Sequence, residues 1–129
     1  MPKDTAFLTV VLIADDNDDH FLPMEETLLQ KGYFVERARS SEDAMLRCSA
    51  PPPVHIALVD ASLPGKNRHL LTRQPRPAGH QPLTFVLMSG FSMAAVSLAL
   101  AWGCKEFLSK PVGREELLAV VKKWSQVKI

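Results

Sequence analysis

Val10-Val11-Leu12-Ile13-Ala14 is followed directly by Asp15-Asp16, and Ile56-Ala57-Leu58-Val59 is followed directly by Asp60. A third run, Glu106-Phe107-Leu108-Ser109, ends at Lys110-Pro111 in the same way. Short runs of this kind are typical of buried strands. In an open parallel sheet the carboxyl ends of the strands meet along one edge. Three acids and one lysine are therefore expected at that edge, where they would suit a cation and a phosphoryl group.

The composition is that of an ordinary globular domain. The chain has 129 residues, of which 47% are hydrophobic and 22% charged, so one domain over residues 1–129 is expected. The net charge is +1, from 15 basic and 14 acidic residues. A nearly neutral chain without a basic stripe does not attract nucleic acid or an anionic membrane over distance, so neither is expected as a partner.

The chain shows neither a membrane span nor a secretion signal. Its longest apolar stretch, Met93 to Trp102, is shorter than the roughly 20 residues that a transmembrane helix needs. The N-terminus leads directly into a strand-like run instead of a cleavage site, so a cytoplasmic location is expected. Cys48 and Cys104 form no CxxC pattern and are expected to be buried reduced thiols. Surface or packing roles are expected for the dispersed histidines, His20, His55, His69 and His80.

Strand-like segments alternate with helical ones along the chain. Strands are expected at about Thr9 to Ala14, Tyr33 to Ala38, His55 to Val59, Leu83 to Ser89 and Glu106 to Ser109. Helices are expected from Phe21 to Leu29, Ser40 to Leu46, Asn67 to Arg73, Ser92 to Trp102, and Gly113 onward. The order (βα)5 with right-handed crossovers predicts an α/β fold, a doubly wound flavodoxin-like sandwich with parallel strand order 2-1-3-4-5.

Prolines complicate two of the helical segments. Pro23 lacks an amide hydrogen and is best tolerated in the first turn, so the first helix is expected to start late or to bend. Residues 75–82 contain three prolines and a glycine. The helix that ends near Arg73 is therefore expected to be short and to be followed by a long loop.

Together with their spacing, these residues resemble the receiver domain of two-component response regulators. The resemblance rests on Asp15-Asp16-Asn17, Leu58-Val59-Asp60-Ala61-Ser62-Leu63-Pro64, Met88-Ser89-Gly90 and Phe107-Leu108-Ser109-Lys110-Pro111. Ser89 lies 29 residues after Asp60, and Lys110 lies 21 residues after Ser89, both close to the family's usual intervals. The likeness spans essentially the whole chain. It implies a signalling domain of a bacterial type that catalyses only its own phosphorylation and slow dephosphorylation.

The resemblance implies a role for each acid. Asp60 accepts a phosphoryl group from a histidine kinase or a histidine phosphotransfer protein. A magnesium ion, or manganese in its place, is held by Asp15, Asp16, Asp60 and the backbone carbonyl of Ser62. In the family pattern Asp16 is the direct ligand and Asp15 acts through water. Such oxygen ligands suit Mg²⁺, and a cation is needed because carboxylate attack on phosphorus builds up negative charge.

The resemblance also implies how the state of Asp60 is read. Lys110, whose bond to Pro111 is typically cis in the family, pairs with Asp60 at rest and with the phosphoryl oxygens afterwards. Ser89 donates its hydroxyl to the aspartyl phosphate, and Phe107 is the aromatic switch residue that follows it inward. These movements change the surface made by the fourth helix, the fifth strand and the fifth helix. The signal then reaches a downstream protein, a histidine in a relay, an output domain of a longer parent chain, or a second copy in a homodimer.

The proline-rich residues 75–82 and the segment after Pro64 depart from the family pattern. After Leu63-Pro64 the family usually has an acid or asparagine followed by glycine, whereas here Asn67 is followed by Arg68. This difference puts the geometry beside Asp60 in question. By the resemblance, Phe91 occupies a position that in the family influences how fast the acyl phosphate hydrolyses. A bulky apolar side chain there obstructs attacking water, which predicts slow self-dephosphorylation.

Three functions are compatible with these residues. The first is a phosphorylatable receiver domain over residues 1–129, without an output domain. The second is a pseudo-receiver that only binds or dimerises, which the altered segment after Pro64 leaves open. The third is a magnesium-dependent phosphohydrolase, which fits less well because such enzymes carry a DxD arrangement on the first strand. Labelling of Asp60 by a phosphodonor separates these readings.

Overall fold

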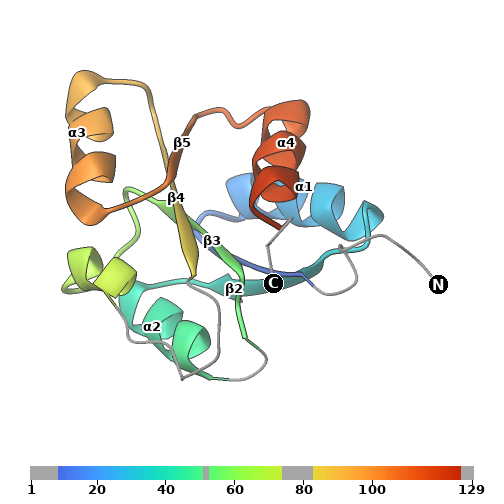
Figure 1. Cartoon of the computed structure of the whole chain (residues 1–129), viewed down its shortest axis with the longest axis horizontal. Coiled ribbons are helices and arrows are strands. Elements are labelled where there is room, and N and C mark those ends of the chain that lie inside the picture. The colour runs from blue at the N-terminus through green and yellow to red at the C-terminus, as the bar shows by residue number, and fades with distance from the viewer. Residues whose placement is uncertain (1–8, 51–52, 74–82, 126–129) are drawn as a thin grey trace.

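The computed structural model describes residues 9–50, 53–73 and 83–125. They form one parallel sheet ordered β2-β1-β3-β4-β5, with helices on both faces (Figure 1). The strands are β1 (Val10–Ala14), β2 (Phe34–Ala38), β3 (Ile56–Asp60), β4 (Thr84–Ser89) and β5 (Glu106–Ser109). The helices are α1 (Asp18–Gln30), α2 (Ser41–Ser49), the 3-10 helix η2 (Arg68–Arg73), α3 (Met93–Trp102) and α4 (Arg114–Ser125). The predicted fold class and strand order are confirmed.

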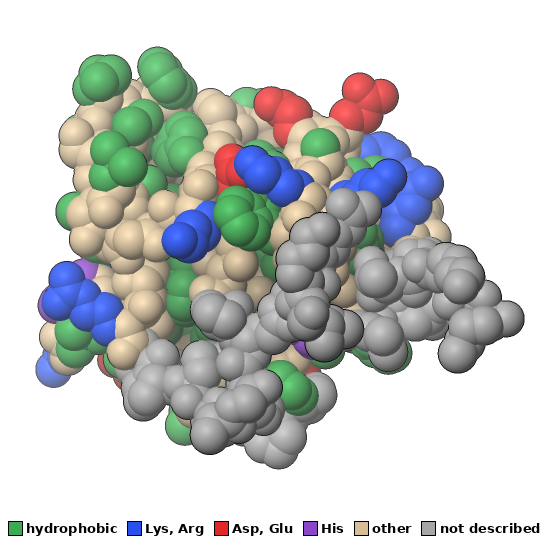
Figure 2. Space-filling view, viewed as in Figure 1, with side chains coloured by type: hydrophobic (Ala, Val, Ile, Leu, Met, Phe, Trp, Pro, Cys, Tyr) green, Lys and Arg blue, Asp and Glu red, His purple; other side chains and the backbone are tan. Residues whose placement is uncertain are grey.

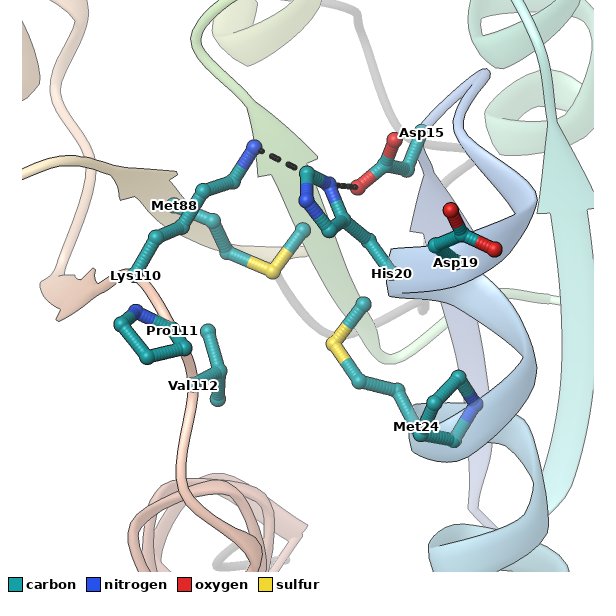
Figure 3. Close-up of a pocket in the computed structure, with 9 residues that line it drawn as sticks. Asp15, Asp19, His20, Met24, Met88, Lys110, Pro111 and Val112 are labelled. Carbon is teal, nitrogen blue, oxygen red and sulfur yellow. Dashed lines mark hydrogen bonds and ion pairs between the residues drawn. The ribbon is translucent and has the colours of Figure 1, made fainter.

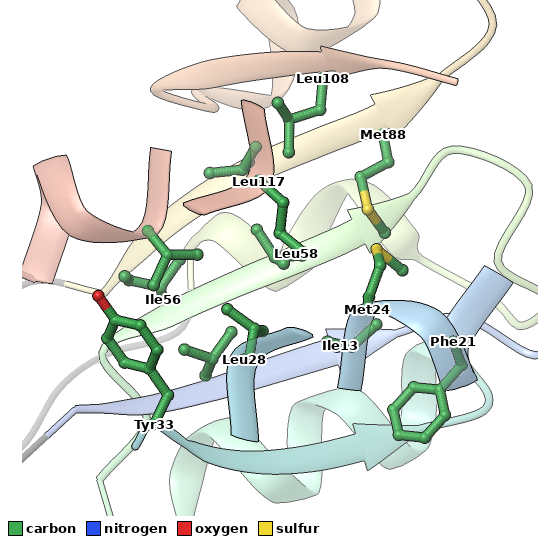
Figure 4. Packing of buried hydrophobic residues seen from close by; sticks show 13 residues of the cluster. Ile13, Phe21, Met24, Leu28, Tyr33, Ile56, Leu58, Met88, Leu108 and Leu117 are labelled. Carbon is green, nitrogen blue, oxygen red and sulfur yellow. The ribbon is translucent and has the colours of Figure 1, made fainter. Parts of the chain in front are cut away.

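The core is divided into two layers by the alternation of side chains along β1. Val11 and Ile13 belong to the cluster that packs α1 and α4 on one face of the sheet, as Figure 4 shows for Ile13. Leu12 belongs to the cluster on the other face, where α2 and η2 lie. Every residue of β1 and of β3 is buried. Coverage on both faces explains why these strands are continuously apolar.

The first helix starts earlier than its proline suggests. α1 begins at Asp18, directly after Asn17, whose side-chain oxygen accepts a 2.8 Å hydrogen bond from the Asp19 backbone N–H. Asp18 and Asp19 add negative charge at the positive end of the helix dipole. Pro23 lies inside the helix, so the expectation of a late start is wrong. The cap and the first-turn acids stabilise the start of the helix, and its buried face offsets the one amide hydrogen bond that Pro23 cannot make.

The other helix ends follow their capping residues. The hydroxyl of Ser40 accepts from the Asp43 N–H at the start of α2, and the hydroxyl of Ser92 accepts from the Ala95 N–H at the start of α3. Gly103 ends α3 in the left-handed conformation, with φ of +78°. Within the part of the chain that the structure describes, no helix is both long and apolar enough to cross a membrane.

The segment between β3 and η2 is docked on the start of α2. The Ser41 backbone N–H donates to the Pro64 carbonyl, and the Ser41 hydroxyl donates to the Lys66 carbonyl, both at 2.8 Å. Gly65 has φ of +121°, and a β-carbon there would lie 2.1 Å from the Ser41 Oγ. A glycine is therefore required at this contact. η2 is short, as predicted, and the proline-rich residues that follow Arg73 lie outside the described residues.

Both cysteines are thiols, as expected, although only Cys48 is fully buried. Burial raises the pKa of Cys104 to about 11. The Cys104 thiol therefore stays protonated near neutral pH, which makes it a poor nucleophile and a poor metal ligand.

Candidate functional site

Three of the predicted charges meet at the carboxyl edge of the sheet. Asp15 follows β1, Asp60 is the last residue of β3, and Lys110 follows β5. The Asp15 side chain has no solvent exposure and Asp60 is 3% exposed. Lys110 Nζ lies 2.8 Å from Asp60 Oδ1, and the Lys110-Pro111 bond is cis. A buried carboxylate is thus paired with an ammonium group where the strand ends converge.

Asp15 carries an unsatisfied oxygen. Its Oδ1 accepts a 2.9 Å hydrogen bond from the Asn17 N–H, but its Oδ2 is buried without a hydrogen-bond partner among the described residues. Burial raises the pKa of the Asp15 carboxyl, and the nearby charge of Asp60 raises it further, against the lowering effects of the Asn17 N–H, Lys110 and His20. Within the described part of the chain, an ionised Asp15 has beside Oδ2 only His20 Nδ1 at 3.5 Å, which is positive only when the imidazole is protonated. A divalent cation would give this buried oxygen a positive partner.

His20 also lies at the site, although a surface or packing role was expected for it from the sequence. Its Nδ1 lies 3.5 Å from Asp15 Oδ2 and 3.4 Å from Lys110 Nζ (Figure 3). One ligand atom each from Asp15, His20 and Asp60 lies within 4.8 Å of the others. The side chain is 44% exposed, so the surface description is correct but incomplete. His20 lies in the first turn of α1, whereas the sequence predicted this helix only from Phe21, so its approach to Asp15 was not predicted.

The remaining histidines keep the roles expected of them where the structure describes them. His55 Nδ1 accepts a 3.0 Å hydrogen bond from the Val10 N–H, which is a packing role beside β1. His69 is exposed on η2. His80 lies outside the described residues.

Two predicted metal ligands have less direct support. Asp16 is exposed and is not part of the three-residue cluster of ligand atoms. The Ser62 backbone N–H donates to Asp60 Oδ1 at 3.0 Å, which places the Ser62 peptide beside the Asp60 carboxylate. The carboxylates of Asp15 and Asp60, including the unpartnered Oδ2 of Asp15, fit a divalent cation, because hard cations prefer carboxylate oxygens. Asp16 and the Ser62 carbonyl stay predictions.

Ser89 and Phe107 lie on the neighbouring strands. Ser89 ends β4 opposite Ser109 of β5, and its carbonyl accepts a 2.8 Å hydrogen bond from the Lys110 N–H. Phe107 is half-buried, and its ring meets the ring of Phe91 edge to face, with centroids 6.4 Å apart. Phe91 is 71% exposed. The predicted switch residue Phe107 is thus connected to the surface through a second aromatic ring.

Arg68 bridges the segment after Asp60 to the end of α3. Its Nη1 donates to the Ala61 carbonyl and, at 3.3 Å, to the Leu63 carbonyl. Its guanidinium carbon lies 5.7 Å from the centre of the Trp102 ring, within range of a cation–π contact. The sequence identified Arg68 only as a departure from the family pattern. Its contacts depend on tertiary structure, and only its long, multiply donating side chain could have suggested them.

A cleft opens beside the charged cluster, with a volume of about 200 Å³. Charged groups of Asp15 and Lys110 lie at one end of the cleft, and apolar side chains form much of its wall (Figure 3). The apolar lining residues are Pro23, Met24, Met88, Pro111 and Val112. The cleft therefore combines charged groups with an apolar wall, as ligand-binding clefts commonly do.

Comparison with known proteins gives a consistent result. The sequence model described as "Response regulator receiver domain" matches residues 11–122. The sensor histidine kinase GacS of Pseudomonas protegens is 30% identical over 120 residues, which are 89% of this chain and 13% of the kinase. The chain thus spans only a small part of that curated relative.

Solved structures show the same fold. A response regulator of Chloroflexus aurantiacus has a TM-score of 0.81 and 26% identity, with 92% of this chain and 98% of that chain covered. A chain from the co-crystal structure of the Saccharomyces cerevisiae histidine phosphotransfer protein Ypd1 with the receiver domain of Ssk1 has a TM-score of 0.79. Its identity is 20%, and the match covers 91% of this chain and 88% of that chain.

Proposed function

The chain belongs to the response regulator receiver domain family of two-component signalling, and we propose that Asp60 is its phosphoacceptor. The observation that carries the proposal is the buried pair of Asp60 and Lys110, 2.8 Å apart at the converging strand ends. Asp60 offers the covalent nucleophile, and Lys110 offers a positive charge that a transferred phosphoryl group can share. The donor is a histidine kinase or a histidine phosphotransfer protein.

The transfer is an in-line displacement at phosphorus. A carboxylate oxygen of Asp60 forms the new phosphorus–oxygen bond as the phosphorus–nitrogen bond of the donor phosphohistidine breaks. The electron pair of that bond stays on the imidazole nitrogen of the donor, which takes up a proton. Lys110 Nζ and the Ser62 N–H, both already directed at Asp60 Oδ1, oppose the negative charge that builds up.

A divalent cation, Mg²⁺ or Mn²⁺, completes the proposal. Asp15, Asp16, Asp60 and the Ser62 carbonyl would hold it, and the unpartnered Oδ2 of Asp15 is the feature of this chain that fits it best. When bound, the ion acts as a Lewis acid toward the phosphoryl oxygens. Removal of the ion with a chelator should therefore stop labelling of Asp60.

The phosphorylated state is read on the α3-β5-α4 surface. Ser89 donates its hydroxyl to the phosphoryl group, and Phe107 moves inward as β4 and its following loop shift. The change is a population shift between two packings, so a partner that binds one of them more tightly receives the signal. Such a partner is a downstream protein, an output domain of a longer parent chain, or a second copy of this chain.

Acetyl phosphate with Mg²⁺ tests the assignment without a cognate kinase. The intact wild-type protein should gain the mass of one phosphoryl group, because the small donor needs only the acceptor, the ion and Lys110. The Asp60→Asn variant should gain nothing. Asp43→Asn, an acid on α2, should be labelled like the wild type. An unlabelled wild type would indicate a pseudo-receiver, and undiminished labelling of Asp60→Asn would place the acceptor elsewhere.

A further inference from the structure

The imidazole of His20 faces the unpartnered oxygen of Asp15. The distance of 3.5 Å between Nδ1 and Oδ2 exceeds that of a normal hydrogen bond, and Oδ2 has no hydrogen-bond partner among the described residues. The side chain of Asp15 has no solvent exposure, so water does not replace the missing partner from outside. The two groups form an ion pair only when the imidazole is protonated, and Lys110 Nζ lies 3.4 Å from the same ring nitrogen. With a neutral imidazole, two electron-pair donors lie face to face.

The spacing of these two atoms is that of two ligands of one ion. Nitrogen and oxygen atoms each about 2.1 Å from a tetrahedral metal lie about 3.4 Å apart. A ligand oxygen of Asp60 lies within 4.8 Å of both atoms, so a third donor is within reach of the same centre. The three donors come from α1, β3 and the residue after β1, which are fixed relative to one another by the core.

Charge at the site permits a divalent ion beside Lys110. Asp15 and Asp60 supply two negative charges when ionised, whereas Lys110 supplies one positive charge and contacts Asp60 Oδ1 at 2.8 Å. The other oxygens of the two carboxylates remain for the ion. A neutral imidazole adds a ligand without adding charge. Lys110 Nζ lies 3.4 Å from the same Nδ1, so an ion bound there would displace the lysine from the imidazole.

We infer that His20 is a ligand of the cation site, which gives the site a nitrogen donor and a preference for first-row transition ions such as Co²⁺, Ni²⁺ or Zn²⁺ over Mg²⁺. Imidazole nitrogen binds these ions well, whereas Mg²⁺ prefers an all-oxygen shell. The inference rests on the proposed function in one respect, since the ion would share Asp60 with the phosphoryl group. The ion that supports phosphorylation would then depend on which metal the cell supplies.

Absolute preference is a poor test, because almost any site with nitrogen and oxygen donors binds Co²⁺ more tightly than lighter ions. The informative quantity is how the ratio of Co²⁺ to Mg²⁺ affinity depends on His20. Both affinities are measured by titration of the unphosphorylated full chain, without a phosphodonor, in wild type, His20→Gln, His69→Gln and Asp15→Asn. His69 is the matched control, an exposed histidine on η2.

The His20→Gln variant should lose at least about tenfold in Co²⁺ affinity, since loss of even an outer-shell partner costs that much, while its Mg²⁺ affinity changes little. His69→Gln should match the wild type, and Asp15→Asn should lose both ions. The visible spectrum of bound Co²⁺ should change in His20→Gln only, as expected when a nitrogen ligand is removed.

An unchanged ratio in His20→Gln, or equal loss of Co²⁺ and Mg²⁺ affinity, overturns the inference. Either result leaves the proposed function standing if Asp60 is still phosphorylated. Conversely, His20-dependent Co²⁺ binding in a chain whose Asp60 accepts no phosphoryl group would reject the proposed function alone.

Discussion

α3 and α4 both pack beside β5, but they bury very different parts of their surfaces. α4 is amphipathic, with Leu117 and Val121 buried against the sheet. α3 buries only the small residues Ala95 and Ala99 and leaves Met93 and Leu100 more than 70% exposed. The space-filling view shows the resulting apolar side chains over α3, at the upper left (Figure 2).

The difference separates the part of the molecule that holds the chemistry from the part that is free to respond. We call the face of the sheet covered by α1 and α4 the α1–α4 side. Its helices are packed on the sheet by buried apolar residues, and it carries Asp15, His20 and Lys110. The α3 side, defined by α3 with Phe91 and Phe107, has large apolar groups at the surface. A helix with few buried contacts shifts at low cost, and a partner can cover its outer face.

The largest expected effect contrasts one leucine from each helix. Leu117→Ala should lower the free energy of unfolding by about 3 kcal/mol, since Leu117 is 1% exposed and its removal leaves a cavity. Leu100→Ala, the matched change at 75% exposure, should change it by less than about 0.5 kcal/mol. Urea unfolding of both variants measures the difference. Equal losses would mean that α3 is as firmly packed as α4.

Arg68 links the segment after Asp60 to Trp102 at the end of α3, so it is expected to restrict the movement of this helix. Arg68→Ala removes the hydrogen-bond donor to the Ala61 and Leu63 carbonyls and the contact with Trp102. The free energy of unfolding should therefore fall by about 1–2 kcal/mol. Labelling by acetyl phosphate should also slow, because the segment after Asp60 loses its support. Arg73→Ala, an exposed arginine at the end of η2, serves as the control. The fluorescence of Trp102 reports its contact with Arg68 when Trp124 is replaced by phenylalanine in both proteins. If Arg68→Ala keeps the wild-type labelling rate and the wild-type Trp102 fluorescence, Arg68 does not link the segment after Asp60 to α3.

Asp15 should lower the free energy of unfolding of the protein at neutral pH when no cation is bound. Burial raises its folded-state pKa above the unfolded value, so the stability associated with its protonated form is present at acid pH and lost as pH rises. Asp15→Asn should therefore be more stable than wild type at pH 7 in a chelator, on the order of 1 kcal/mol. The gain should disappear below the usual aspartate range.

The same variant should lose the stabilisation that a bound cation gives. Saturating Mg²⁺ should raise the melting temperature of the wild type but not that of Asp15→Asn, because only a ligand that binds the folded state adds stability. Thermal unfolding across pH, with and without Mg²⁺, measures both effects. A variant that is less stable than wild type in chelator at pH 7 would contradict this reading of Asp15.

The smallest expected effect is at the entrance to α3. Phe91→Asn removes the ring that contacts Phe107 and opens a path for water, so the aspartyl phosphate should hydrolyse roughly threefold faster, less than about 1 kcal/mol in barrier height. Phe91→Leu keeps an apolar cover and should hydrolyse at the wild-type rate. Loss of the label over time measures the rate. Phosphate loss from Phe91→Asn that is no faster than from wild type would reject the predicted shielding.

Much of the fold could be predicted because local chemistry and tertiary structure agree. Continuously apolar strands require helices on both faces, and Ser40 and Gly103 mark helix ends that the structure confirms. The strand-end rule also brought Asp15, Asp60 and Lys110 to one edge, where the structure places them. Knowing that these residues follow strands was sufficient to predict that they lie close together, because the carboxyl ends of parallel strands meet at one edge of the sheet.

Other features depended on side-chain paths that sequence spacing does not encode. His20 reaches the site only because α1 begins at Asp18, whereas Pro23 favoured a later start for this helix. Arg68 contacts Trp102 across a gap of 34 positions in the chain, through a path set by packing. Asp16 is next to a buried acid but is itself exposed, because α1 starts just beyond it.

The central claim is that Asp60 carries the phosphoryl group. Borohydride reduces the carbonyl of an acyl phosphate and leaves homoserine in place of the modified aspartate, so peptide mapping identifies the acceptor directly. After treatment with acetyl phosphate and Mg²⁺, homoserine should be found at position 60. Its yield should be much lower in the Lys110→Ala variant and in the sample treated with a chelator. Homoserine at position 15 or 16, or none in a sample that binds Mg²⁺ and is folded, would contradict the account.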